Sequence, residues 1–204
     1  MRITGGQYRG RILRAPKSGV RPTQDRVREA VFNILMTRMD GARVLDLYAG
    51  SGAVGLEALS RGASDVTWVE RDSKTLAILR TTVEKISDNG GRIVADETTR
   101  YLRRAAGRTP YDIIYADPPY VDARTDEEDP LPKLLELIHE GEVLAKDGIF
   151  VYESAGGRRA AKTDPPQGWQ TVIDREYGRT RIQVFGTIDQ LNSRTTNRER
   201  GRQE

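Results

Sequence analysis

The order of the predicted elements constrains the fold of this chain more than any other feature of its sequence. From Arg43 onward, short runs rich in β-branched and aromatic residues alternate with segments that have the period of an amphipathic helix. We predict strands at 43–48, 65–69, 92–95, 111–116 and 148–153, and helices at 53–61, 73–87, 98–106 and 131–140. Such alternation is typical of parallel strands joined by right-handed helical crossovers. The fold class is therefore α/β, with a mostly parallel, Rossmann-like sheet.

The segments on either side of this region have patterns of their own. We expect a short hairpin within residues 2–14, a helix that opens at Thr23 and a closing antiparallel hairpin within residues 170–188. The last residues are polar throughout, and we expect them to be disordered. The predicted organisation is a basic N-terminal arm over 1–22, one Rossmann-like domain over 23–188 and a polar tail over 189–204.

Positive charge is concentrated at the N-terminus. The formal net charge is only +3, but residues 1–28 contain eight Arg or Lys and one acid, so they carry +7 and the remainder carries −4. Such an arm can neutralise the phosphates of a nucleic acid. The alternative is a solvated basic face that only keeps the protein in solution. The candidate RNA-binding residues are Arg9, Arg11, Arg14, Arg21, Thr23 and Arg26.

Composition excludes several classes of function. The chain has no cysteine and a single histidine, His139, so thiolate chemistry is excluded and we expect no metal site. No apolar run approaches the roughly 20 residues of a membrane-spanning helix, and the N-terminus lacks the apolar segment of a signal peptide. We therefore expect a cytoplasmic, monomeric protein without a membrane partner.

A glycine-rich turn follows the first predicted strand and leads into a helix. Glycines permit a tight backbone path and the close approach of a ligand, while the helix N-terminus offers free N–H groups. The spacing Gly50-x-Gly52-x-x-Gly55 fits both NAD and S-adenosylmethionine, so it does not separate these two cofactors. The candidate cofactor-binding residues at this turn are Asp46, Tyr48, Ala49, Gly50, Ser51 and Gly52.

Carboxylates also end the next two predicted strands. Glu70 follows Asp46 by 24 residues, close to the roughly 20 expected for an acid that accepts hydrogen bonds from ribose hydroxyls. Arg71 beside it is a further cofactor-binding candidate. Asp96 ends the third strand, where it could accept a hydrogen bond from an adenine amino group, with Glu97 as a competing candidate. All three acids are expected at one edge of the sheet.

Asp117-Pro118-Pro119-Tyr120 follows the fourth predicted strand and carries most of the chemical information. The exocyclic amine of a base is a poor nucleophile because its lone pair is delocalised into the ring. A carboxylate and a backbone carbonyl that accept its two N–H groups would aim the lone pair at a sulfonium methyl group. Tandem prolines add no N–H donors, and Tyr120 can stack on a flipped base. We predict catalytic roles for Asp117, Pro118, Pro119 and Tyr120.

Together these motifs resemble the RsmD-like bacterial methyltransferases, which modify the exocyclic N2 of a guanine in 16S ribosomal RNA. The likeness covers roughly residues 2–187 and also includes Arg2-Ile3-Thr4-Gly5-Gly6, Arg21-Pro22-Thr23 and Tyr177-Gly178-Arg179-Thr180. It implies a seven-stranded class I methyltransferase fold with an N-terminal β-hairpin, and S-adenosylmethionine as the methyl donor. It also implies 16S rRNA in an assembling 30S subunit as the partner.

By the same resemblance, the glycine turn would hold the methionine end of the cofactor, Glu70 the ribose and Asp96 the adenine. The acidic segment 122–129 is longer than the family pattern leads us to expect. Three other functions stay open. An amino-methyltransferase acting on DNA adenine or a protein glutamine would share the Asp-Pro-Pro-Tyr motif. An NAD-dependent oxidoreductase, or a non-catalytic RNA-binding module, would leave Asp117 without a role.

Overall fold

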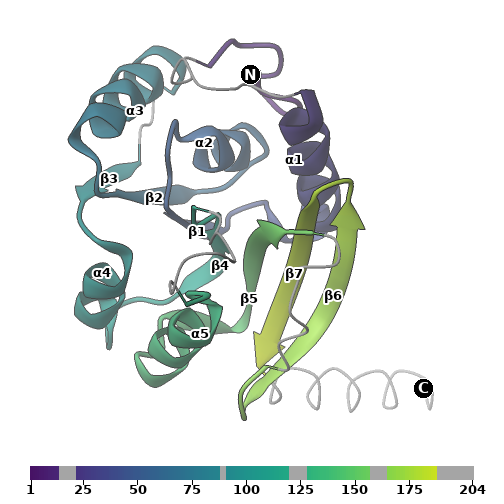
Figure 1. Ribbon diagram of the computed structural model, residues 1–204. Coiled ribbons are helices and arrows are strands. Elements are labelled where there is room, and N and C mark those ends of the chain that lie inside the picture. The colour runs from purple at the N-terminus through teal and green to yellow at the C-terminus, as the bar shows by residue number, and fades with distance from the viewer. Residues whose placement is uncertain (14–21, 88–90, 120–127, 157–164, 188–204) are drawn as a thin grey trace, which may run out of the picture.

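One seven-stranded sheet runs through the protein in the order β3-β2-β1-β4-β5-β7-β6 (Figure 1). The computed structural model describes residues 1–13, 22–87, 91–119, 128–156 and 165–187. The parallel strands are β1 (Arg43–Leu47), β2 (Asp65–Glu70), β3 (Arg92–Ala95), β4 (Tyr111–Ala116) and β5 (Leu144–Ala155). The antiparallel hairpin is β6 (Trp169–Tyr177) and β7 (Thr180–Thr187), with β7 paired to β5. The predicted α/β class and mostly parallel sheet are confirmed.

β5 is longer than the predicted strand because it contains an irregularity. Tyr111 pairs with Leu144, but the next pair joins Ile113 to Ile149, so several residues of β5 oppose a single residue of β4. This bulge adds residues 144–147 to the strand. They include an exposed Lys-Asp pair, which interrupts the apolar pattern from which the strand was predicted.

Helices cover both faces of the sheet. α1 (Pro22–Ile34), α2 (Ala53–Ser60) and α3 (Ser73–Ile86) pack on one face, and α4 (Thr98–Ala105) and α5 (Leu131–Glu140) pack on the other (Figure 1). Side chains of each strand alternate between the two layers, as Val44 and Leu45 of β1 illustrate. A short 3-10 helix, η1 (Met36–Arg38), follows α1 and was not predicted. No helix in these described parts is long and apolar enough to cross a membrane.

Three helices begin beside a carboxylate that satisfies N–H groups of the first turn. Asp72 accepts the N–H of Thr75 at 2.8 Å, Glu97 accepts the N–H groups of Thr99 and Arg100, and Asp129 accepts that of Leu131 at 3.0 Å. α2 differs in its N-cap, which is Gly52 and makes no side-chain hydrogen bond. The first turn of α2 still meets a carboxylate, because Oδ2 of Asp46 accepts the N–H of Gly55 at 3.0 Å.

The N-terminal segment packs into the domain instead of forming the two predicted short strands. Residues 1–13 contain one isolated antiparallel bridge, between Arg2 and Ile12. The N–H groups of Gln7 and Tyr8, in the predicted turn, bond to Ser60 of α2. The two flanks of this turn are joined by backbone hydrogen bonds, from the Ile3 N–H to the Arg11 carbonyl at 3.1 Å and from the Leu13 N–H to the Met1 carbonyl at 3.0 Å. Ile3, Tyr8 and Leu13 are buried in the core between the sheet and the layer of α1, α2 and α3.

Candidate active site

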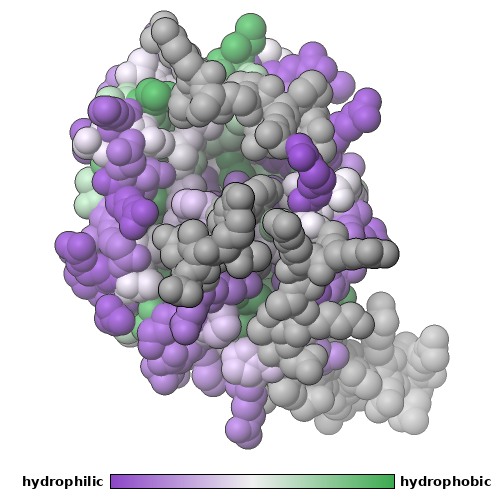
Figure 2. Space-filling view, in the orientation of Figure 1, coloured by the Kyte–Doolittle hydropathy of each residue, from purple (hydrophilic) through white to green (hydrophobic). Residues whose placement is uncertain are grey.

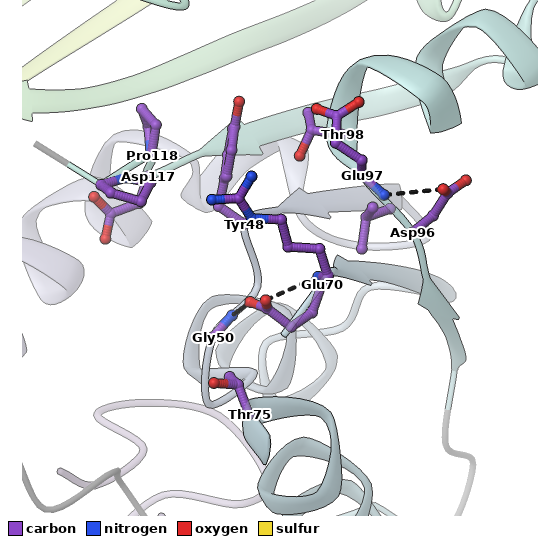
Figure 3. Close-up of a pocket in the computed structure, with 12 residues that line it drawn as sticks. Tyr48, Gly50, Glu70, Thr75, Asp96, Glu97, Thr98, Asp117 and Pro118 are labelled. Atoms are coloured by element: carbon purple, nitrogen blue, oxygen red, sulfur yellow. Dashed lines mark hydrogen bonds between the residues drawn. The ribbon is translucent and has the colours of Figure 1, made fainter. Parts of the chain in front are cut away.

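A pocket of about 400 Å³ lies at the carboxyl edge of the parallel strands (Figure 3). It opens next to β1 and β4, where the strand order changes direction, which is the usual position for a ligand in an open α/β sheet. Its size falls within the range that holds small molecules and cofactors. The lining residues are Tyr48, Gly50, Val69, Glu70, Arg71, Thr75, Asp96, Glu97, Thr98, Asp117, Pro118 and Pro119.

Most of the predicted site residues line this pocket. They come from the ends of four strands and comprise Tyr48, Gly50, Glu70, Arg71, Asp96, Asp117, Pro118 and Pro119. Four predicted cofactor residues are buried and are not among the lining residues, namely Asp46, Ala49, Ser51 and Gly52. Tyr120 lies outside the described residues. Val69, Thr75 and Thr98 also line the pocket and were not singled out, although each lies within five residues of a strand-end acid.

Two glycines of the turn, Gly50 and Gly55, are required for different reasons. A Cβ added at Gly55 would lie 2.2 Å from Nε1 of Trp68 and 2.7 Å from Cγ1 of Val66, whereas one at Gly50 would meet nothing closer than 3.8 Å. Gly55 is therefore required by the packing of α2 on β2. Gly50, with a φ of 55°, combines a backbone conformation that favours glycine with an open position on the pocket wall.

Tyr48 has a φ of 57°, which is uncommon for a bulky residue. This left-handed conformation costs a residue other than glycine about 1–2 kcal/mol of conformational energy, and residues that adopt it concentrate at functional sites. The half-buried side chain of Tyr48 stands in the pocket next to Thr98 (Figure 3). Burial raises the pKa of Tyr48, and a hydrogen bond with Thr98 opposes this shift.

Three backbone N–H groups hold the carboxylate of Glu70. Oε2 accepts the N–H of Gly50 at 2.9 Å, and Oε1 accepts that of Arg71 at 2.8 Å (Figure 3). Oε1 also accepts the N–H of Asp72 at 2.8 Å. These bonds join the end of β2 to the glycine turn. A carboxylate offers about four lone-pair sites, so Glu70 keeps capacity to accept a further hydrogen bond from a hydroxyl group in the pocket.

Asp96 reaches the pocket, but α4 engages its carboxylate. Nε of Arg100 lies 3.3 Å from Oδ1, and Arg104 contacts Oδ2. An adenine amino group at Asp96 would therefore compete with Arg100 and Arg104.

The neighbouring Glu97 has a carboxyl group with a lowered pKa. Burial acts to raise this pKa, but hydrogen bonds from Thr99 and Arg100 outweigh burial and lower it.

Asp117 follows β4 and lines the pocket, where part of the residue is exposed although protein atoms surround its carboxyl group, while Pro118 is buried. Ala116 pairs with Tyr152, so Asp117 lies beside Glu153 at the end of β5. Enclosure by the surrounding protein atoms raises the pKa of Asp117 well above its usual value, and the charges of Glu153 and Asp46 act in the same direction. When ionised, Asp117 is a stronger base than an ordinary aspartate.

Asp46 is only 2% exposed and faces the start of α2, where its Oδ2 accepts the N–H of Gly55 at 3.0 Å. Burial raises the pKa of Asp46 to about 8, the Gly55 hydrogen bond opposes this effect, and the charge of Glu70 adds to it. The structure thus places Asp46 beneath the glycine turn. Contact with a cofactor remains a prediction for this residue.

The predicted RNA-binding residues differ in how free their charges are. Arg9 and Arg26 are exposed. Arg11 is exposed as well, but it donates a hydrogen bond to the carbonyl of Ile86 at 2.5 Å and lies over the ring of Tyr8. Arg14 and Arg21 lie outside the described residues, as does the side chain of Thr23.

Arg28, which contributes to the charge of the N-terminal arm, is 6% exposed and pairs with Asp25 and Glu57. Its charge is therefore not available to a phosphate. A second basic surface, not predicted, lies on α4 next to the pocket and contains the exposed residues Arg100, Arg103 and Arg104. Figure 2 shows hydrophilic side chains gathered over this side of the molecule.

Comparisons with known proteins identify the family and the fold of this chain. The family model described as conserved hypothetical protein 95 matches residues 1–186. Ribosomal RNA small subunit methyltransferase D of Escherichia coli is 37% identical over 155 residues, which are 76% of this chain and 74% of that protein. TTHA0928 of Thermus thermophilus has a TM-score of 0.73 and 29% identity, over 92% of this chain and 99% of that chain.

SMU.776, solved in complex with SAH, shares the fold, with a TM-score of 0.61 and 18% identity over 81% of this chain and 50% of that chain. The resemblance to RsmD-like methyltransferases inferred from the motifs is confirmed by the family match and by these relatives. Since the family model spans nearly the whole chain, the protein belongs to the family described as conserved hypothetical protein 95.

Proposed function

We propose that the protein transfers the methyl group of S-adenosylmethionine to the exocyclic N2 of a guanine in 16S ribosomal RNA, within an assembling 30S subunit. One observation carries the proposal: the Asp117-Pro118-Pro119 turn and the Glu70 carboxylate line the same pocket (Figure 3). Methylation of an amine requires the donor and an acceptor for the amine N–H groups to meet in one cavity. The name of the Escherichia coli relative supports small-subunit rRNA as the substrate.

The residues of the pocket fit S-adenosylmethionine. Glu70 has a spare lone pair for a ribose hydroxyl, and the wall at Gly50 is free of a side chain. Asp96 and Glu97 lie on the side where the adenine would bind. When bound, S-adenosylmethionine supplies an electrophilic methyl group. No group of histidine and carboxylate side chains in the described ranges could hold a metal ion.

The chain's own residues would orient the nucleophile. The Asp117 carboxylate and a backbone carbonyl of the Pro118-Pro119 turn would accept the two N–H groups of the amine, which turns its lone pair toward the methyl carbon. Tyr120 would stack on the base, and the exposed Arg9 and Arg26 would contact phosphates. We further propose that the protein acts as a monomer in the cytoplasm.

Methyl transfer to purified ribosomal subunits tests this function. The protein is incubated with S-adenosylmethionine labelled in its methyl group and with 30S subunits from a strain that lacks it. We expect the label in 16S rRNA, on N2 of one guanine. The 50S subunits, 30S subunits from the parent strain and the Asp117→Ala variant serve as controls.

Label in added DNA or in protein would contradict the proposal and favour the other amino-methyltransferases. Binding of NAD without binding of S-adenosylmethionine, compared by calorimetry, would favour an oxidoreductase.

A further inference from the structure

Glu153 is a carboxylate next to the candidate site to which the proposed chemistry assigns no role. It lies near the end of β5, and the pairing of Ala116 with Tyr152 places it beside Asp117. The Tyr115 hydroxyl donates a hydrogen bond to Oε2 of Glu153 at 2.5 Å. The Glu153 side chain is therefore held in place by β4, the strand that leads directly into Asp117.

Charged and titratable groups face Glu153 from several elements. Tyr115 and Asp117 approach from β4, and Arg28 from α1, while Ile182 is its apolar partner on β7. Asp46 of β1 acts on Asp117. Arg28, the one positive charge named among these groups, is also paired with Asp25 and Glu57. The cluster of Asp46, Asp117 and Glu153 therefore has an excess of negative charge when all three are ionised.

The surroundings of Glu153 and Asp117 determine which of these two carboxyl groups ionises at the lower pH. Burial raises the pKa of Glu153, but the hydrogen bond from Tyr115 and the charge of Arg28 both lower it. Among the described residues, no such donor or cation contributes to the shift of Asp117, and the charge of Glu153 raises the pKa of Asp117 further. When like charges share a site, one group ionises and the other holds its proton to higher pH.

We propose that Glu153 is a positioning residue that acts through Asp117. Its negative charge, held in place by Tyr115 and Arg28, makes Asp117 basic enough to take the proton that the methylated amine releases. This inference rests on the proposed function. It adds to that function a base, Asp117, whose affinity for a proton depends on Glu153 of the neighbouring strand β5.

The proton balance of the reaction shows what Asp117 must do. The amine nitrogen forms a bond to the methyl carbon while the bond from that carbon to sulfur breaks, and the electron pair of the broken bond stays on sulfur. The nitrogen then carries a positive charge and transfers one proton to the Asp117 carboxylate. Because Asp117 is partly exposed and lines the pocket, the proton can leave to water.

Carboxyl 13C NMR titration of the full chain tests the inference without any RNA. The Asp117 signal is assigned with Asp117→Asn. In Glu153→Gln, the titration midpoint of Asp117 should fall by about 1 pH unit or more, because a neighbouring negative charge is removed. Glu140→Gln, which alters an exposed glutamate at the end of α5, is the matched control and should leave the midpoint unchanged.

Tyr115→Phe is the second variant, in case Glu153→Gln does not fold. Without the Tyr115 donor, Glu153 holds its own proton to higher pH and repels the ionised Asp117 less, so the Asp117 midpoint should fall by a smaller amount. In folded Glu153→Gln and Tyr115→Phe proteins, an unchanged Asp117 midpoint would overturn the inference.

The pH dependence of methyl transfer provides the catalytic readout. Turnover of the wild type should be lost as the pH falls through the raised pKa of Asp117, and this acidic limb should move to lower pH in Glu153→Gln. The KM for 30S subunits should stay the same. An acidic limb that does not move with the NMR midpoint would overturn the role of Asp117 as the base. A wild type that methylates no rRNA refutes the proposed function instead, while the NMR titration still decides whether Glu153 tunes Asp117.

Discussion

The two walls of the pocket use the same kind of side chain, a carboxylate at the end of a strand, in opposite surroundings. On the cofactor wall, formed by Gly50, Glu70 and Glu97, the carboxylates accept hydrogen bonds from backbone N–H groups. On the reaction wall, formed by Asp117 and Pro118, the Asp117 carboxylate lies next to the carboxylate of Glu153 on the adjacent strand β5. The pKa of Glu97 is lowered as a result, whereas that of Asp117 is raised.

These different surroundings suit the two walls to different tasks, which are cofactor binding and proton transfer. A carboxylate satisfied by N–H donors stays ionised and is suited to accept a hydroxyl, but it has little affinity for a proton. A carboxylate beside like charges binds a proton strongly, so it can act as a base. The donors on the cofactor wall come from the glycine turn and from the start of α4, both of which follow strands closely in sequence.

The largest expected effect is at the reaction wall. Asp117→Ala should lower turnover by on the order of 10² or more, the typical cost of removing one preorganised group from a transition state. Binding of S-adenosylmethionine should change little, because the cofactor wall is intact. Turnover and calorimetric binding are measured on the same preparation, with Asp147→Ala, an exposed aspartate at the start of β5, as the control. Near-normal turnover would remove Asp117 from the reaction.

The complementary change is at the cofactor wall. Glu70→Ala should weaken binding of S-adenosylmethionine by roughly 10-fold to 100-fold, the equivalent of losing a hydrogen bond to a charged group. Turnover at saturating cofactor should fall much less than in Asp117→Ala. Glu84→Ala, at an exposed position of α3, is the control for the calorimetry. An unchanged dissociation constant would show that Glu70 does not contact the cofactor.

The glycine turn offers a matched pair of substitutions. Gly55→Ala should cost about 1–3 kcal/mol of stability, because the new Cβ would overlap the indole of Trp68 and overpack a rigid core. Gly50→Ala has space for its Cβ, but the φ of 55° at this position strains a residue that has a Cβ by about 1–2 kcal/mol. This variant should therefore also lose some stability and, unlike Gly55→Ala, weaken cofactor binding. Urea unfolding and calorimetry are measured on both variants. Unchanged cofactor binding in Gly50→Ala would remove Gly50 from the cofactor site.

The smallest effect is expected at the surface. Replacing both Arg9 and Arg26 with Glu should weaken RNA binding several-fold and reduce its salt dependence by about one unit of slope for each phosphate that is no longer neutralised. Turnover on saturating substrate should be maintained. Binding is measured over a range of salt concentrations, with Arg80→Glu on α3 as the control. A constant slope would identify the arm as a solvated face.

Local patterns in the sequence were sufficient for most of the fold. Every predicted strand and helix from Arg43 to Thr187 is present, because alternation and helical period depend on neighbours within one element. The packing of the N-terminal segment was not predictable from such patterns. The N–H groups of Gln7 and Tyr8 bond to Ser60, about 50 residues away in the chain, and no local pattern reports that contact.

The candidate site was likewise predictable from the sequence only in part. The strand-end positions of Glu70, Asp96 and Asp117 already placed them at one edge of the sheet, since parallel strands share a direction. The burial of Arg28 could not be predicted, because its partner Glu57 lies on another helix, α2, 29 residues along the chain. The same holds for Glu153, which becomes a neighbour of Asp117 only through strand pairing.

The sequence by itself determined the α/β fold class, the edge of the sheet that carries the site, and the chemistry indicated by Asp117-Pro118-Pro119-Tyr120. All of these depend on residue types and spacings within single elements. Only the tertiary structure decided which glycines serve the pocket, which arginines are free, and which carboxylate repels Asp117. Burial and Coulombic interaction depend on distances between elements, and those distances exist only after the sheet and helices have packed together.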